Sequence, residues 1–520
     1  MSRRLLKSTA VVGAMTLLSR LLGFVRDMVV ARIFGASAGT DAFFVAFKIP
    51  NFMRRLFAEG AFSQAFVPVL SEYKSQREHQ EVRQLVSDVT GTLGGFLFLI
   101  TAVGVLAAPW LIYVFAPGFS GEPEKFDLAA QMLRLTFPYL LFISVTALFG
   151  GVLNTYGRFS IPAFTPVFLN LTLIAAALWL APQMQQPIVA LAWGVFIAGL
   201  VQLLFQLPYV ARLGLLSWPR WAWHVGGIQR IIKLMLPAIF GSSVAQINLL
   251  LDTVLASMLV TGSVSWLYYS DRLVEFPLGV FGIALATVIL PSLSKNYAEK
   301  STEEFSKTLD WALRWVMLIG TPAMVGLLVL SGPMLTTLFQ YGEFTPGDVR
   351  MARLSLMAYS IGLMGFMLVK VLAPAYYARQ DTKTPMKIGV KAMISNMVLN
   401  VVFAVPMVIY AVPGAHAGLA AATAVSAFIN AGLLYRGLHK ERVFMPESGW
   451  WLLFVRVVLA NGLMGLLLWY GTGDLEHWFQ MRSWQRAADL TLWVGIGVIA
   501  YFGTLFATGV RGKDLIIRKS

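Results

Sequence analysis

Long apolar runs recur along the whole chain and are separated by short polar loops. A transmembrane helix needs about 20 mostly apolar residues, and runs of that length continue from near residue 8 to near residue 509. We therefore predict an all-α polytopic membrane protein with about fourteen transmembrane helices. The predicted spans are 8–34, 41–70, 87–115, 128–155, 161–181, 188–211, 231–258, 264–293, 309–337, 351–377, 386–411, 414–436, 449–471 and 487–509.

Composition supports this class and excludes others. Hydrophobic residues make up 57% of the chain and charged residues 13%, whereas soluble proteins carry roughly 25% charged residues. The chain has no cysteine and five histidines, which excludes disulfides and thiolate metal sites. It shows neither a Walker-type phosphate loop nor a His-Glu-x-x-His motif. We predict a protein that is not an enzyme.

The N-terminus imitates a secretory signal, with basic residues, an apolar run and Ala36-Ser37-Ala38. The run is too long for a signal peptide and contains Arg20 and Arg26, so we expect a retained first span.

The loops alternate in charge. One side carries Arg3, Arg4, Lys7, Lys74, Arg77, Arg83, Arg158, Arg212, Arg220, Arg230, Lys233, Lys295, Lys300, Lys307, Arg379, Lys383, Lys387, Arg436, Lys440, Arg442, Arg511, Lys513, Arg518 and Lys519. The other side carries Lys125, Arg350, Arg482 and Arg486. Because cytoplasmic loops are richer in lysine and arginine, both termini are predicted to be cytoplasmic. The net charge of +15 then indicates orientation and contact with membrane lipid rather than nucleic acid.

The chain resembles itself at an offset near 223. Gly39 pairs with Gly262 and Pro68 with Pro291, and Tyr156-Gly157-Arg158 is echoed by Tyr377-Ala378-Arg379. Six spans per repeat give both halves one orientation, which predicts two pseudo-symmetric six-helix lobes around a central cavity. We assign residues 1–220 to the N-terminal lobe, 221–442 to the C-terminal lobe and 443–520 to two extra C-terminal helices.

Several arginines lie inside or at the ends of apolar runs, namely Arg20, Arg26, Arg54 and Arg272. An arginine near the bilayer centre costs roughly 2.5–3.5 kcal/mol even on the mildest scale, so these residues need polar surroundings inside the protein. The planar guanidinium binds two phosphate oxygens at once. The sequence therefore predicts a cationic interior that accepts an anion.

The first span holds two of these arginines. Arg20 and Asp27 share a helix face, whereas Arg26 points about 120° away from Arg20. A bend at Gly23 would bring both arginines toward one cavity. A local ion pair between Arg26 and Asp27 at a helix end is the alternative.

The second span combines Asp41, Asn51 and Arg54. Arg54 lies about 20 Å along the helix from Asp41 and therefore well inside the membrane. Pro50 frees a backbone carbonyl, which is tolerated where a helix lines a wet cavity. The other charged residues of this span are equally compatible with snorkelling or pairing: Lys48, Arg55 and Glu59.

The eighth span carries Ser265, Arg272 and Glu275, and the last two lie three residues apart on one face. They form either a self-satisfied pair or an arginine that a carboxylate holds until an anion displaces it. Asp252, Asn396 and Asn400 offer hard oxygen ligands on two spans. These three residues offer a site for a monovalent cation, with proton carriage by Asp252 or pairing of this acid with a neighbour as alternatives.

Several motifs resemble one known family. They are Ser19-Arg20-x-x-Gly23-Phe24-x-Arg26-Asp27, Ala31-Arg32-Ile33-Phe34-Gly35, Thr40-Asp41-Ala42-Phe43, Lys48-x-Pro50-Asn51, Arg54-Arg55, Phe57-Ala58-Glu59-Gly60-Ala61-Phe62, Gly262-Ser263-Val264-Ser265-Trp266-x-Tyr268-Tyr269-x-Asp271-Arg272 and Leu290-Pro291-Ser292-Leu293-Ser294. They resemble the MurJ (MviN) family of lipid II flippases, which belongs to the multidrug/oligosaccharidyl-lipid/polysaccharide exporter superfamily. The resemblance covers essentially the whole chain.

The resemblance implies a substrate and a site. The substrate would be undecaprenyl-diphosphate-linked disaccharide pentapeptide, moved from the cytoplasmic to the periplasmic leaflet of the bacterial inner membrane for peptidoglycan synthesis, where peptidoglycan synthesis proteins are expected partners. The implied substrate-binding residues are Arg20, Arg26, Asp41, Asn51, Arg54, Ser265, Arg272 and Glu275. The last two helices would form a groove for the lipid tail, and Asp252 matches the acid of a sodium site in some members.

Two other functions remain open from the residues alone. One is a flippase for another polyprenyl-linked saccharide, and the other is a MATE-like multidrug antiporter, whose cationic substrates a cationic cavity would repel. No cofactor is expected. The energy source is predicted to be sodium or proton coupling, or the membrane potential, which is worth about 2.3 kcal/mol per charge per 100 mV.

Overall fold

The computed structural model describes residues 3–56 and 62–511, and every regular element in these residues is a helix. The chain forms two compact units, Met1–Ser265 and Trp266–Ser520. The all-α polytopic prediction is therefore confirmed. Glu59 and the rest of residues 57–61, together with the last predicted loop charges after Arg511, lie outside the described residues.

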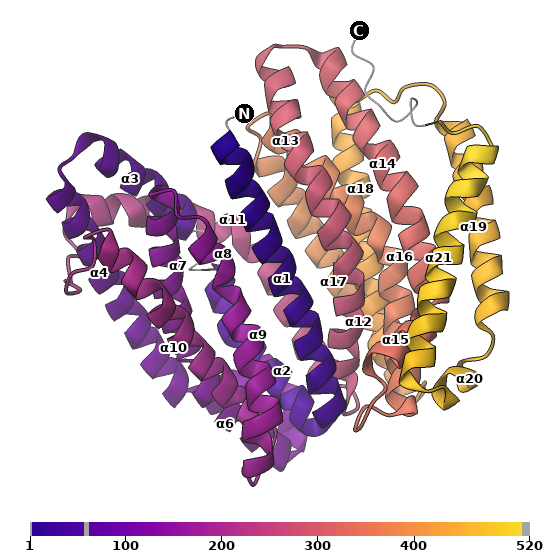
Figure 1. The fold of residues 1–520 in the computed structure, drawn as a ribbon, viewed down its shortest axis with the longest axis horizontal. Coiled ribbons are helices and arrows are strands. Elements are labelled where there is room, and N and C mark those ends of the chain that lie inside the picture. The colour runs from indigo at the N-terminus through magenta and orange to yellow at the C-terminus, as the bar shows by residue number, and fades with distance from the viewer. Residues whose placement is uncertain (1–2, 57–61, 512–520) are drawn as a thin grey trace. The chain divides into compact units, whose positions relative to one another are not determined.

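The first unit contains helices of very different lengths (Figure 1). They are α1 (Arg3–Phe34), α2 (Ala38–Arg54), α3 (Ser63–Gln76), α4 (His79–Leu106), α5 (Ala108–Phe115), η2 (Pro117–Gly121), α6 (Pro123–Thr136), α7 (Tyr139–Thr155), α8 (Ser160–Phe164), α9 (Pro166–Ala175), η3 (Ala176–Leu180), η4 (Ala181–Gln183), α10 (Val189–Arg212) and α11 (Gly226–Ser257). Prolines stand at several of the breaks, as Pro138 does between α6 and α7, because a proline removes a backbone donor.

The second unit starts within α12 (Ser263–Pro277), whose first residues belong to the first unit. It continues with η5 (Leu278–Gly282), α13 (Ile283–Ala298), α14 (Thr302–Val329), α15 (Ser331–Phe339), α16 (Pro346–Tyr377), α17 (Lys383–Ile409), α18 (Ala415–Lys440), α19 (Trp450–Thr472), α20 (Leu475–Gln480) and α21 (Ser483–Ala507).

Within the described residues, each predicted span overlaps one helix or consecutive helices. Ten spans of the described part are long and apolar enough to cross a membrane. The other four predicted spans coincide with α1, with α2 and α3, with α11, and with α12 and α13. These four contain the predicted site residues apart from those of α17. The arrangement of the lobes around a central cavity stays a prediction.

Helix bounds repeat at the offset found in the sequence. Helix α14 has the same length as α4, and both of its ends are shifted by 223 positions. The starts of α16 and α17 are shifted by the same 223 positions from those of α6 and α8. The weak sequence repeat therefore marks a repeat of local structure. The predicted boundaries at 220/221 and 442/443 stay predictions; in this structure α11 packs against α3 within the first unit.

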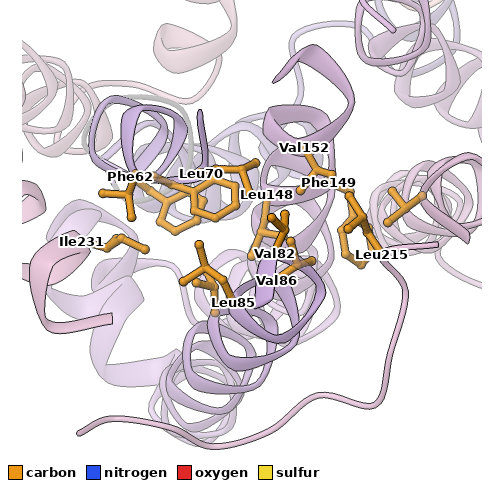
Figure 2. Packing of buried hydrophobic residues seen from close by; sticks show 14 of the residues in the cluster. Phe62, Leu70, Val82, Leu85, Val86, Leu148, Phe149, Val152, Leu215 and Ile231 are labelled. Carbon is orange, nitrogen blue, oxygen red and sulfur yellow. The ribbon is translucent and has the colours of Figure 1, made fainter. Parts of the chain in front are cut away.

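A hydrophobic core holds α3, α4, α7 and α11 together in the first unit. Figure 2 shows Val82, Leu85 and Val86 of α4 facing this cluster, and Leu215, which follows α10, also belongs to it. Leu215 is fully buried. The core thus fixes one face of α4 and the start of the segment that leads from α10 to α11.

The two C-terminal helices form a pair in the second unit. Helices α19 and α21 lie side by side and pack against α14 (Figure 1). The hydroxyl of Tyr501 donates to the carbonyl of Leu318 at 2.9 Å, and the amide of Asn461 donates to Thr321 at 2.9 Å. The two extra helices are therefore joined to the repeat by polar as well as apolar contacts.

Candidate functional site

Arg26 lies in a built network between α1 and α9. Its guanidinium donates to Oδ1 of Asp27 at 2.6 Å and to Oδ1 of Asn170 at 3.1 Å, and both Arg26 and Asp27 are buried. Asn170 in turn donates to the carbonyl of Ser19 at 2.9 Å. Arg26 and Asp27 therefore form the ion pair of the alternative, although inside α1 and not at a helix end, and Asn170 adds a second acceptor that the sequence did not indicate.

Arg20 differs from Arg26 in its surroundings, because it is exposed on α1. The helix continues without interruption through Gly23, beside which the side chain of Asn170 lies. A Cβ at Gly23 would contact this amide at an ordinary 3.5 Å. Within the first unit, the two arginines thus present one accessible and one fixed positive charge.

Asp41 and Ser265 are brought together at the start of α12. The carboxylate of Asp41 accepts from the backbone N–H of Gly262 at 2.7 Å and of Ser265 at 2.9 Å. The hydroxyl of Ser265 donates to the same carboxylate at 2.6 Å. An acid that accepts the first N–H groups of a helix stabilises the helix end. We call this group, Asp41 with Gly262 and Ser265, the outer latch.

Lys125 completes the charge balance of the outer latch. Its ammonium lies 3.6 Å from Oδ2 of Asp41 and donates to the hydroxyl of Thr261 at 3.0 Å. Lys125 is only 4% exposed, and Asp41 only 1%. Sequence reasoning treated Lys125 as an ordinary loop charge, although a lone lysine on a side poor in positive charge was a signal. Asp41 and Ser265 are thus closed off from ligands in this structure.

Asn51 and Arg54 lie one helical turn apart on α2. The Nε of Arg54 donates to Oδ1 of Asn51 at 3.1 Å, and both residues are partly exposed. The amide therefore orients the guanidinium and leaves part of it accessible. Lys48 is also partly exposed, and Arg55 is exposed.

Arg272 and Glu275 form the predicted pair in the second unit. The guanidinium lies 2.9 Å from Oε2 of Glu275 and 5.6 Å from the ring centre of Tyr268. The two side chains are 32% and 49% exposed, so an anion in solution reaches both. An ion pair this exposed contributes little, about 0–1 kcal/mol, and an incoming phosphate can replace the carboxylate.

The predicted sodium ligands divide between the units. Asn400 donates to Oδ1 of Asn396 at 2.6 Å, and Asn396 donates to Thr423 at 3.2 Å, all within the second unit. Asp252 is partly exposed on α11 of the first unit. The side-chain oxygens of these three residues are hard ligands and suit sodium, but the three residues do not all belong to one unit. Among the described residues no group of three or more His, Cys, Asp or Glu gathers as a metal site.

One buried arginine was missed entirely. Arg486 is 5% exposed and donates to four backbone carbonyls: those of Thr336, Gln340, Trp478 and Phe479. It was predicted as a loop charge. Its position in the first turn of α21 was the only indication that it would be drawn inward.

Known proteins resemble this chain over almost its whole length. The family described as lipid II flippase MurJ matches residues 30–486. A protein of Vibrio cholerae serotype O1 named "Probable lipid II flippase MurJ" is 52% identical, over 99% of this chain and 98% of its own length. A solved "Lipid II flippase MurJ, inward closed conformation" has a TM-score of 0.79 at 26% identity, covering 95% of this chain and 97% of the other.

A more distant solved structure shows the fold alone. An inward-facing multidrug resistance MATE family transporter of the MOP superfamily has a TM-score of 0.65 at 14% identity, covering 84% of this chain and 98% of the other.

Proposed function

The chain belongs to the lipid II flippase MurJ family, and from that premise we propose that it moves lipid II across the bacterial inner membrane. As a flippase it is a transporter and not an enzyme. The substrate is undecaprenyl-diphosphate-linked disaccharide pentapeptide, and the direction is from the cytoplasmic to the periplasmic leaflet for peptidoglycan synthesis.

The observation that carries this proposal is the set of arginines on apolar helices. Arg20 is exposed, Arg54 is partly exposed and Arg272 is 32% exposed. A diphosphate has several oxygens that guanidinium groups can share, and such charge-assisted bonds are about twice as strong as neutral ones. We assign these three residues to direct contact with the diphosphate.

The remaining predicted residues have different roles in this proposal. Arg26, held by Asp27 and Asn170, supplies a fixed positive charge beside the substrate. Asn51 orients Arg54, and Glu275 holds Arg272 until the diphosphate displaces it.

The outer latch supplies a conformational step. Asp41 and Ser265 are buried here and therefore act by holding the start of α12. Opening toward the periplasm would break these hydrogen bonds, as alternating access requires one end to open while the other closes. The polyprenyl chain would stay in lipid, in a groove formed by α19 and α21.

Orientation and energy source complete the proposal. Both termini are cytoplasmic, since one set of loops holds most of the lysines and arginines. The membrane potential would draw the positively charged empty cavity back inward, at about 2.3 kcal/mol per charge per 100 mV. Sodium would be held by Asp252, Asn396 and Asn400. Peptidoglycan synthesis proteins would be the partners of this chain.

The experiment depletes a cell of its own flippase and expresses this chain. Lipid-linked precursor on the outer leaflet is then measured for the wild type, for Arg272→Ala and for the control Arg158→Ala, which removes an exposed charge from a loop. We expect exposure with the wild type and the control, and its loss in Arg272→Ala at normal insertion.

Two results would count against the proposal in different ways. A well-inserted wild type that exposes no precursor would favour another polyprenyl-linked saccharide as substrate. An active Arg272→Ala would exclude Arg272 from the site. A MATE-like drug antiporter is not favoured, because its relation to this chain is one of fold alone.

A further inference from the structure

The segment between α10 and α11 runs extended along one face of α4. We call residues 216–223 the strap. The N–H of Arg220 donates to the carbonyl of Ser87 at 3.2 Å, and the N–H of Ala222 donates to the hydroxyl of Thr92 at 3.1 Å. The hydroxyl of Ser87 also donates to the carbonyl of Trp218. The strap is therefore fixed to α4 by its backbone.

Two glycines of α4 create the space for the strap. A Cβ at Gly91 would lie 2.3 Å from backbone atoms of Arg220, and a Cβ at Gly95 would lie 2.8 Å from the ring of Trp221. Such distances are far inside van der Waals contact, so a larger residue would displace the strap. With Ser87, these small residues recur every four positions and form a groove along the helix.

A pocket of about 730 Å³ opens between α4 and the strap. Helix α4 contributes Gln80, Arg83, Gln84 and Ser87, which its periodicity places on one face, and the strap contributes Ser217 and Arg220. The opposite face of α4 is held in the core by Val82, Leu85 and Val86 (Figure 2). The pocket wall is therefore rigid on the helix side.

The pocket carries net positive charge. Of the described residues that line it, two are arginines and none is acidic. Asp88 lies in the same stretch of α4 and interacts electrostatically with Arg220, but it is 2% exposed and does not line the pocket. The hydroxyl of Ser217 is buried and has no hydrogen-bond partner among the described residues. The site thus offers two exposed guanidinium groups and two exposed amides to a ligand.

The pocket lies where α4 changes from polar to apolar. Beyond it, Phe98, Leu99 and Val103 of the helix are more than half exposed, as expected for lipid-facing side chains. On the strap, Trp218 is 90% exposed and Trp221 is 64% exposed. Tryptophans gather at the level of the lipid headgroups, because the ring is amphipathic.

We propose that this pocket binds the phosphate of an anionic phospholipid headgroup, with Arg83 and Arg220 as its ligands. Lipid binding at this pocket is independent of the substrate that the chain transports. Arginine pairs phosphate oxygens bidentately, and the tryptophans would lie among the neighbouring headgroups. The bound lipid would hold the strap on α4 and so fix the connection to α11.

The test uses the purified full-length chain and native mass spectrometry. The chain is titrated with phosphatidylglycerol and with zwitterionic phosphatidylethanolamine. The test variant is Arg83→Gln/Arg220→Gln, and the matched control is Arg158→Gln/Arg212→Gln, which removes two exposed arginines that do not line the pocket. At about 1 kcal/mol per arginine, we expect the test variant to bind phosphatidylglycerol roughly 10- to 30-fold more weakly.

A second variant keeps both arginines and moves the strap. Gly91→Val should weaken phosphatidylglycerol binding by a similar factor, and gel filtration checks that it is folded. Equal loss in the control variant, or unchanged affinity in the test variant, would overturn the proposal. Displacement of the lipid by inorganic phosphate at physiological concentration would also overturn it, because the site would then serve a free anion.

The lipid-binding test and the precursor-exposure test of the proposed function can fail independently of each other. Failure of lipid binding in a chain that still exposes precursor would refute only the pocket. Failure of precursor exposure in a chain that still binds phosphatidylglycerol would refute only the flippase assignment.

Discussion

Removal of the Asp41 carboxylate should open the start of α12 locally. The Asp41→Ala variant leaves two backbone N–H groups and one hydroxyl without their shared acceptor and leaves Lys125 without its buried acid. A hydrogen bond to a charged group contributes about 1.5–3 kcal/mol. Allowing for water that replaces part of the loss, we expect opening to become easier by about 3 kcal/mol, which is a factor of roughly 100.

The chain offers a clean assay because it contains no cysteine. Ser263 is fully buried beside the outer latch, and its hydroxyl has no hydrogen-bond partner among the described residues. Ser263→Cys therefore provides a thiol that reacts with a maleimide only when the start of α12 opens. The rate of labelling at low maleimide concentration reports the opening equilibrium.

The control thiol is Ser144→Cys on α7, which is 1% exposed and also lacks a hydrogen-bond partner in the described part of the chain. We expect Asp41→Ala to raise labelling of Cys at position 263 about 100-fold and to leave labelling at position 144 unchanged. An unchanged rate at position 263 would refute the latch, and an equal rise at both positions would indicate general unfolding.

Other parts of the structure give further predictions. Arg486→Ala removes the donors to four backbone carbonyls and should lower the thermal unfolding midpoint by about 5–10 °C, measured by tryptophan fluorescence; an unchanged midpoint would contradict this stabilising role of Arg486. Glu275→Gln removes the competitor for Arg272 and should tighten binding of a diphosphate lipid up to about fivefold, and weaker binding in a titration would contradict this. The hydrogen bond from Arg230 lowers the pKa of Glu72 from its ordinary 4.5, so the pair contributes above the unfolded pKa and is lost as pH falls through the folded one. Glu72→Gln should therefore show a smaller decline of the unfolding midpoint below pH 4.5 than the wild type, and parallel curves would refute the assignment.

The sequence predicted the helices well because the bilayer imposes a simple pattern. An apolar run of about 20 residues leaves few alternatives to a helix, and the repeat at 223 positions reappears in the bounds of α4 and α14. The breaks inside spans were less visible. The break at Ala107 between α4 and α5 is followed by Pro109 in the first turn of α5, a signal that hydropathy does not report.

The sequence identified which residues belong to the candidate site, but it predicted the roles of only some of them. The free-energy cost of an arginine inside the membrane identified these residues as candidates, since each such charge must be compensated by a polar partner. Pairings across the chain carried no local signal: Asn170 reaches Arg26 over 144 positions, and Asp41 reaches Ser265 over 224 positions. Asp41 was therefore expected to meet substrate, whereas its carboxylate is filled by backbone donors of the protein itself.

Reconstitution allows the movement of lipid II across a bilayer to be measured directly. The purified chain is reconstituted into liposomes with fluorescent lipid II, a membrane potential is imposed, and a reductant that cannot cross the bilayer is added outside. If the chain moves lipid II, bleaching proceeds beyond the outer leaflet's share with the wild type and stops at that share with Arg20→Ala/Arg272→Ala. A wild type whose bleaching also stops at the outer leaflet's share would contradict the proposal that this chain moves lipid II.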